Sequence, residues 1–262
     1  MWLRILTAIL LAPVFMASTL WLPTELFAVL IGIIVVVGLW EWSRLSRVSV
    51  RCWMMTCGVM LVLMFGLYHF EWMYMACVVG GLYWVFQVYD LRKHGLETAF
   101  SGGGFAFHGP LVLTAAWSGL VLLHQNGAMG PVLALGFIVS IWAADSFAYF
   151  AGRAFGRHKL APEISPGKTV EGVIGGAIGA LVIAGGFVFL ITDFSPERAA
   201  LWMVLTFFAA LISVAGDLYE SRLKRLVGAK DSGQLLPGHG GALDRIDGLL
   251  AAAPFFVAVF LI

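Results

Sequence analysis

The sequence predicts an all-α integral membrane protein with about nine transmembrane helices. Of its 262 residues, 61% are hydrophobic and 12% are charged, whereas soluble domains contain about 45–50% apolar and about 25% charged residues. The mean hydropathy is +0.93. The apolar residues also gather in long runs, and a helix needs about 20 such residues to cross a bilayer. The chain therefore belongs in a membrane.

Nine apolar runs are the expected spans. Because equally apolar segments follow the first run, a retained helix explains it better than a cleaved signal peptide. The runs cover residues 5–22, 26–40, 52–68, 72–88, 105–123, 131–150, 170–191, 199–215 and 249–262. The second and the ninth run are short, so a tilted or re-entrant segment is an alternative for each of them.

Basic residues lie almost entirely on one side of these spans. Since positively charged loops stay in the cytoplasm, we expect a cytoplasmic N-terminus and a C-terminus on the opposite side. Arg198 falls on that opposite side. The cytoplasmic set is Arg4, Arg44, Arg47, Arg51, Arg92, Lys93, Arg153, Arg157, Lys159, Lys168, Arg222, Lys224, Arg225, Lys230 and Arg245. The net charge of only +1 gives no reason to expect a nucleic-acid partner.

One membrane domain is expected over residues 1–262, because neither an internal repeat nor a linker is visible. Residues 1–140 have short connections and are expected to form a scaffold. Residues 141–262 interrupt their spans with segments rich in charge and glycine, so this half is expected to be catalytic. The three cysteines lack the spacing of a disulfide framework or a zinc site.

The segment GDLYESRLKR, residues 216–225, is expected to prolong the eighth span into the cytoplasm. On a helical period one face carries Asp217, Glu220, Ser221 and Lys224. A solvated helix end would explain this pattern. However, an ionisable group at membrane depth costs about 2.5–3.5 kcal/mol and usually marks a site, so a functional site is the sharper hypothesis.

Two further carboxylates stand at the start of the last span. Asp244 and Asp247 in LDRIDG lie three residues apart on one helical face. The helix dipole alone would favour them there. Together with Asp217 they also offer the oxygen ligands that Mg²⁺ prefers, and Mg²⁺ commonly shares its coordination with substrate phosphates. This hypothesis makes a nucleotide the natural substrate.

A glycine-rich loop, residues 230–242, separates the two helices. Lys230 and His239 can donate hydrogen bonds to anionic oxygens. Such a loop can be only a tight connection, but carboxylates and the sequence RLKR flank it. We therefore interpret it as a phosphate-binding surface.

A second polar segment, residues 142–172, brings further charged and hydroxyl side chains to the same side. They are Asp145, Ser165, Lys168, Thr169 and Glu171. PGKT within it is not a P-loop, because Pro162 stands where that pattern needs glycine. The glycines that follow have small-xxx-small spacing and favour helix packing: Gly172, Gly175, Gly176 and Gly179.

Residues 216–248, GDLYESRLKRLVGAKDSGQLLPGHGGALDRIDG, strongly resemble the signature of the bacterial phosphatidate cytidylyltransferases, the CDP-diacylglycerol synthases. Residues 142–172 are similar to the second conserved block of that family, and the first half resembles it only as a series of apolar spans. Ala242 stands where the family usually has a larger aliphatic residue. The resemblance implies transfer of a cytidylyl group from CTP to phosphatidate, with Mg²⁺ required and a second cation nearby, for which a monovalent ion is one candidate.

The resemblance also implies roles for particular residues. Asp217 and Asp244 would be the main metal ligands, with Asp145 and Asp247 in support. The candidate catalytic residues are Asp217, Asp244, Asp247 and Lys230. The candidates for binding CTP, pyrophosphate or lipid phosphate are Ser165, Lys168, Thr169, Ser221, Arg222, Lys224, Arg225, His239 and Arg245. A homodimer in the bacterial inner membrane, with its active site facing the cytoplasm and its C-terminus in the periplasm, is also implied.

Two other functions compete with this one. The protein could instead be a cytidylyltransferase or phosphotransferase that acts on another lipid phosphate, because no sequence feature indicates which acyl chains the substrate carries. An ion-coupled transporter could use Asp145, Asp217 and Asp244 as its pathway. Transporters usually bind at mid-membrane and often contain inverted repeats, whereas here the charges gather at the cytoplasmic ends of the spans.

Overall fold

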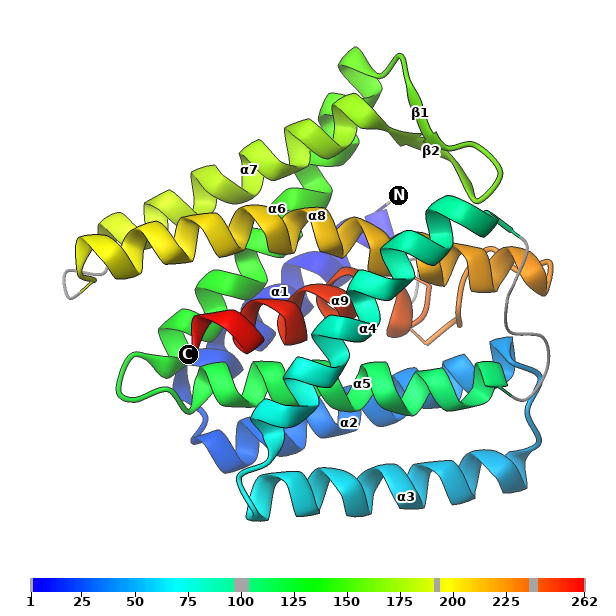
Figure 1. The fold of residues 1–262 in the computed structure, drawn as a ribbon, viewed down its shortest axis with the longest axis horizontal. Helices are drawn as coiled ribbons and strands as arrows, with labels where there is room; N and C mark the ends of the chain where they lie inside the picture. Colours follow the sequence, from blue (N-terminus) through cyan, green and yellow to red (C-terminus); the bar gives the residue numbers. More distant parts are fainter. Residues whose placement is uncertain (1, 97–103, 191–193, 236–239, 262) are drawn as a thin grey trace.

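The computed structural model describes residues 2–96, 104–190, 194–235 and 240–261. These residues form nine helices and a short antiparallel hairpin (Figure 1). In chain order the elements are α1 (Trp2–Trp21), α2 (Thr24–Leu45), α3 (Val50–His69), α4 (Met73–His94), α5 (Gly104–His124), α6 (Gly130–Phe155), β1 (Lys159–Ala161), β2 (Ser165–Thr169), α7 (Val170–Leu190), α8 (Pro196–Leu226) and α9 (Leu243–Phe260).

Each expected span corresponds to one helix, so the predicted all-helical architecture is confirmed. Within the described residues, five helices are long and apolar enough to cross a membrane: α2, α3, α6, α7 and α8. The second expected span is not short, because α2 has 22 residues. The number of crossings and the side on which each terminus lies stay predictions.

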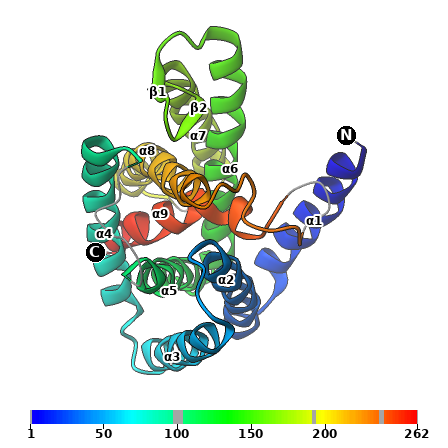
Figure 2. The ribbon, with the colours of Figure 1, turned by 90° about the vertical axis from the view of Figure 1, so that its right-hand side faces the viewer.

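The last helix lies in the middle of the bundle rather than at its edge. α9 contacts α8, α4 and α5, which surround it in both ribbon views (Figures 1 and 2). Six of its residues have no exposed surface: Leu243, Ala251, Ala252, Ala253, Phe256 and Val257. Residues 248–257 of α9 carry no charge and are almost entirely buried, and a helical segment that is apolar on all sides is stable where neighbours cover it. α9 therefore forms the core against which the helices around it pack.

Small residues allow α7 to lie directly against α6. A Cβ added at Gly176 would come within 2.7 Å of the Ala144 carbonyl oxygen, and one at Gly179 would overlap the Phe147 side chain. Glycine lets two helix backbones approach closely in a membrane. The predicted packing role of these glycines is confirmed.

A short hairpin between α6 and α7 adds an element that the sequence did not predict to the all-α fold. Its strands pair antiparallel, with Lys159 opposite Thr169 and Ala161 opposite Ser165. At its turn the Ile164 side chain is only 2% exposed, and Arg225 of α8 donates through Nε to the Ile164 carbonyl oxygen at 3.3 Å. The hairpin is therefore anchored beside the end of α8 (Figure 2).

Candidate active site at the ends of α8 and α9

Helix α8 extends beyond its apolar run and carries polar residues on its last turns. Its 31 residues correspond to about 46 Å at 1.5 Å per residue, compared with about 30 Å for the hydrocarbon core. On one face, Ser221 donates through Oγ to Asp217 Oδ1 at 3.3 Å, and Lys224 Nζ lies 2.9 Å from Glu220 Oε2. The predicted continuous helix with a shared polar face is confirmed.

Three carboxylates from three helices lie near one another beside this face. Asp145 of α6 interacts electrostatically with Asp217, and both interact with Asp247 of α9. Asp247 accepts a hydrogen bond from the Gly248 backbone N–H at 2.8 Å. Since like charges at close range repel, such a group is stabilised by a cation among them.

The positively charged side chain of Lys168 lies at this carboxylate cluster. Lys168, from strand β2, makes an ion pair with Asp217. Arg245 of α9 is exposed and interacts electrostatically with Asp145. The arrangement thus combines oxygen donors with basic groups, which suits both a metal ion and a phosphate.

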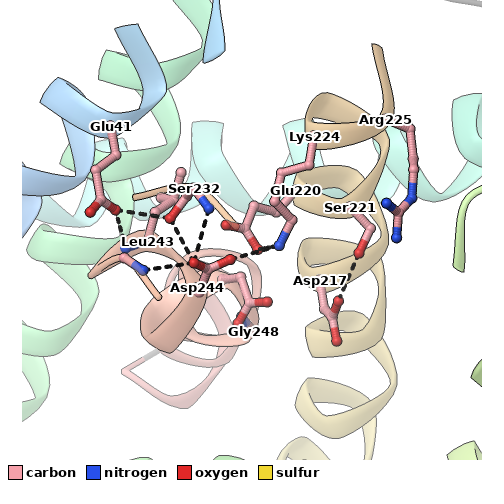
Figure 3. A network of polar contacts seen from close by, with 12 residues as sticks. Glu41, Asp217, Glu220, Ser221, Lys224, Arg225, Ser232, Leu243, Asp244 and Gly248 are labelled. Atoms are coloured by element: carbon pink, nitrogen blue, oxygen red, sulfur yellow. Dashed lines mark hydrogen bonds and ion pairs between the residues drawn. The ribbon is translucent and has the colours of Figure 1, made fainter. Parts of the chain in front are cut away.

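The fourth predicted metal ligand, Asp244, has a different environment. Its Oδ1 accepts from Lys224 Nζ at 2.7 Å. Its Oδ2 accepts from Ser232 N at 3.0 Å, Ser232 Oγ at 2.9 Å and Gly241 N at 2.8 Å. Figure 3 shows this carboxylate between α8 and the loop before α9. In this structure Asp244 joins the loop to the helix ends.

The carboxylates are neighbours without forming an assembled metal centre. In the described part of the chain, no three His, Cys, Asp or Glu side chains are grouped closely enough to hold a metal ion. The donor chemistry nevertheless fits Mg²⁺, which needs only one or two protein carboxylates besides water and phosphate oxygens. Lys168 also shows that a positive group is accepted at Asp217.

Two residues predicted to bind substrate, Arg222 and Thr169, have partners within the fold. Arg222 is 3% exposed and its Nη1 lies 2.6 Å from Oδ2 of the buried Asp90 on α4. Thr169 is 6% exposed, and its Oγ1 accepts from Gly172 N at 3.1 Å at the start of α7. These contacts place both side chains in the packing between elements.

The remaining predicted residues lie around the helix ends. Ser221 is buried and Ser165 is half-buried at the start of β2. Lys230 and Arg225 are exposed, and His239 lies outside the described residues. Lys168 and Lys224 contact the carboxylates directly, so the structure brings these two into the candidate site.

Sequence reasoning missed Glu41 and Ser232, which contact this region. Glu41 belongs to α2 and is completely buried, and Ser232 Oγ lies 3.0 Å from its Oε2 (Figure 3). A single carboxylate at the end of an apolar run was the available signal, because charges at that depth are costly. Its contact partner lies 191 residues further along the chain.

The fold and the site together define a helical protein with helices long and apolar enough to cross a membrane and with a charged site at helix ends. The cytidylyltransferase family matches residues 2–262. The chain is 39% identical over 262 residues to the phosphatidate cytidylyltransferase of Pseudomonas aeruginosa, covering 98% of this chain and 95% of that one. It is 36% identical to the protein of the same name from Haemophilus influenzae, covering 97% and 96%. The chain therefore belongs to the cytidylyltransferase family.

Similarity within this family is higher in part of the chain. The phosphatidate cytidylyltransferase of Bacillus subtilis is 49% identical over 117 residues, which is 45% of this chain and 43% of that one. The family match also includes the first half of the chain, where the sequence showed only a likeness in apolar spans. The match to the family therefore includes residues of the first half, such as Glu41.

Proposed function

We propose that this protein is a phosphatidate cytidylyltransferase, which converts CTP and phosphatidate to CDP-diacylglycerol and pyrophosphate in phospholipid synthesis. The observation that carries the proposal is the similarity along nearly the whole chain to bacterial proteins of that name. The acidic and basic side chains at the ends of α8 and α9 support it, since both substrates are anions. An ion-coupled transporter is disfavoured by the family to which the chain belongs.

In the proposed reaction, an oxygen of the phosphatidate phosphate attacks the α-phosphorus of CTP. The bond from that phosphorus to the bridging oxygen of the β-phosphate breaks, and pyrophosphate leaves with the electron pair. The phosphate monoester is already a nucleophile near neutral pH, so no general base is assigned. The enzyme's main tasks are to align two anions and to stabilise the developing charge.

The chain's own residues divide these tasks. Lys168 and Arg245 lie beside the carboxylate cluster, where they can bind phosphate oxygens. Lys230 is exposed on the loop and is a further candidate for this role. Asp145, Asp217, Asp244 and Asp247 would hold Mg²⁺, which supplies charge neutralisation and substrate orientation when bound. A second cation, for which a monovalent ion is one candidate, would share these carboxylates.

The proposed setting is the bacterial inner membrane, crossed nine times as a homodimer. The concentration of Lys and Arg on one side supports a cytoplasmic N-terminus and a cytoplasmic site. That side also holds the CTP pool. In this setting the helix ends would lie at the inner leaflet, and phosphatidate would enter from there.

The proposal predicts that the purified protein, given labelled CTP, phosphatidate and Mg²⁺ in detergent, forms a labelled lipid and releases pyrophosphate. Asp217→Asn should lower kcat by at least about 100-fold, because it removes an oxygen ligand that supports several kcal/mol of charge stabilisation. Asp217 is a better position for this test than Asp244, because Asp244 also accepts hydrogen bonds from the loop and its replacement would disturb the loop as well.

Glu197→Gln is the matched control, since Glu197 is exposed at the other end of the same helix, and it should retain wild-type activity. Pyrophosphate release without any lipid acceptor would contradict the proposal. Faster reaction with a polyprenyl phosphate than with phosphatidate would indicate the other lipid-phosphate enzyme.

A further inference from the structure

Glu41 is a buried carboxylate that holds the start of α9 from the far end of the sequence. Its Oε2 accepts from Leu243 N at 2.8 Å and from Ser232 Oγ at 3.0 Å, and its Oε1 accepts from Ala242 N at 3.1 Å. The residue has no exposed surface. Figure 3 shows it pointing from α2 toward the loop and Leu243.

These contacts provide hydrogen-bond acceptors for the first backbone N–H groups of α9, which have no side-chain acceptor at the N-cap position. Ala242 precedes the helix and offers no side-chain cap, whereas the first N–H groups of any helix need acceptors from outside its own backbone ladder. A carboxylate satisfies them and also interacts favourably with the positive end of the helix dipole. Glu41 thus caps α9 across a sequence separation of about 200 residues.

Two glycines of the loop before α9, Gly233 and Gly241, lie very close to the same carboxylate. A Cβ built at Gly233 would overlap Glu41 Oε1, and one built at Gly241 would overlap Ser232 Oγ and both carboxylate oxygens of Glu41. Only glycine leaves room for the loop to approach this closely. The two glycines and Glu41 therefore form one structural unit.

Ser232 links this unit to the candidate site. Its Oγ lies 3.0 Å from Glu41 Oε2 and 2.9 Å from Asp244 Oδ2, so the hydroxyl stands within hydrogen-bond distance of both carboxylates and can donate its one hydrogen to either. Asp244 in turn accepts from Lys224 of α8. A continuous set of contacts thus joins α2 to the polar face of α8 (Figure 3).

We infer that Glu41 is a positioning residue for the cytidylyl transfer proposed above: by capping α9 and holding the loop, it sets the places of Asp244 and Asp247. The inference rests on the proposed function for its effect on catalysis. Its structural part, the fixed start of α9, can be measured without substrate or metal.

The first test compares Glu41→Gln with wild type. The amide keeps the size of the side chain but removes its charge, and its NH₂ group cannot accept from the backbone. We expect kcat/KM for CTP to fall at least tenfold and the Mg²⁺ concentration for half-maximal rate to rise. Amide hydrogen exchange in residues 240–248 should become at least tenfold faster in metal-free protein, with α5 and α6 unchanged.

Matched controls separate this role from general stability. Glu25→Gln makes the same change on the same helix, at an exposed position near its start, and should behave as wild type. Glu41→Asp keeps the charge one methylene further away and should recover part of the activity. A purely structural role would lower the yield of folded protein but leave kcat and the Mg²⁺ dependence of that folded fraction unchanged.

A second variant leaves Glu41 in place. Gly241→Ala would crowd both Ser232 Oγ and the Glu41 carboxylate and should reproduce the losses of Glu41→Gln. Gly58→Ala, with nothing near its Cβ, should not. This variant decides the question if Glu41→Gln fails to fold. Wild-type kinetics and exchange in Gly241→Ala, or slower catalysis without faster local exchange, would overturn the inference. A wild-type protein inactive in the assay would instead refute the proposed function, while the exchange measurement still tests the cap.

Discussion

Single charged residues in this protein divide into those that face the site and those that hold helices together. Arg222 shows the second kind, since it forms a buried ion pair with Asp90 and links α8 to α4. His94 Nδ1 lies 2.9 Å from the other oxygen of Asp90. From the sequence, Arg222 belongs with Lys224 and Arg225 as one basic group, because spacing does not show which face of the helix meets α4.

Arg222→Gln should therefore act on stability rather than on CTP binding. Removing one partner of a buried pair leaves the other charge uncompensated and costs about 3–5 kcal/mol. Thermal unfolding in detergent should show the loss, while KM for CTP in the folded fraction stays at the wild-type value. Arg51→Gln, at an exposed site on α3, is the control. A raised KM with unchanged thermal stability would restore Arg222 to the substrate-binding group.

At the scale of elements, hydropathy was a sufficient guide to the helices and a poor one to the hairpin. Every predicted run overlaps one helix along most of its length, because each contains enough apolar residues in sequence. Strands β1 and β2 have three and five residues, with Pro166 and Gly167 inside β2, so no alternating pattern marks them. Their position depends on contacts with α8, which a local pattern does not contain.

The contact of α6 with α7 predicts a clear difference between two glycines of α7. Gly179→Val should destabilise the protein by about 1–3 kcal/mol, because its side chain would overlap Phe147 and force apart closely packed helices. Gly186→Val, where nothing lies within 4 Å, should be nearly neutral. Thermal unfolding of both variants in the same detergent measures the difference. Equal losses would show that helix propensity rather than contact with α6 decides the effect.

For the whole molecule, the distribution of charge predicts the orientation in the membrane. In a variant with all three cysteines replaced by alanine, a cysteine at Glu197 should react with an impermeant maleimide in intact cells. A cysteine at Lys159 should react only after the cells are opened. The reverse labelling pattern would invert the predicted topology and place the site outside the cytoplasm.

The candidate site was predictable only in part, because a local sequence pattern places charged residues on one helix but does not show which helices meet. The polar face of α8 and the acidic start of α9 follow from helical periodicity over a few residues. The cap that Glu41 provides and the pairing of Lys168 with Asp217 depend on the tertiary fold. Local spacing therefore located the charged groups, and the packing of distant helices determined which of them meet.

The central position of α9 has a consequence for how the protein is made. α4, α5 and α8 precede α9 along the chain, and yet they enclose it. During synthesis these helices enter the membrane before the helix that fills the space between them. Until α9 arrives, lipid or one another must cover their inner surfaces. Asp244 and Asp247 enter together with it, so a stalled or shortened chain that lacks α9 would be inserted in the membrane without an active site.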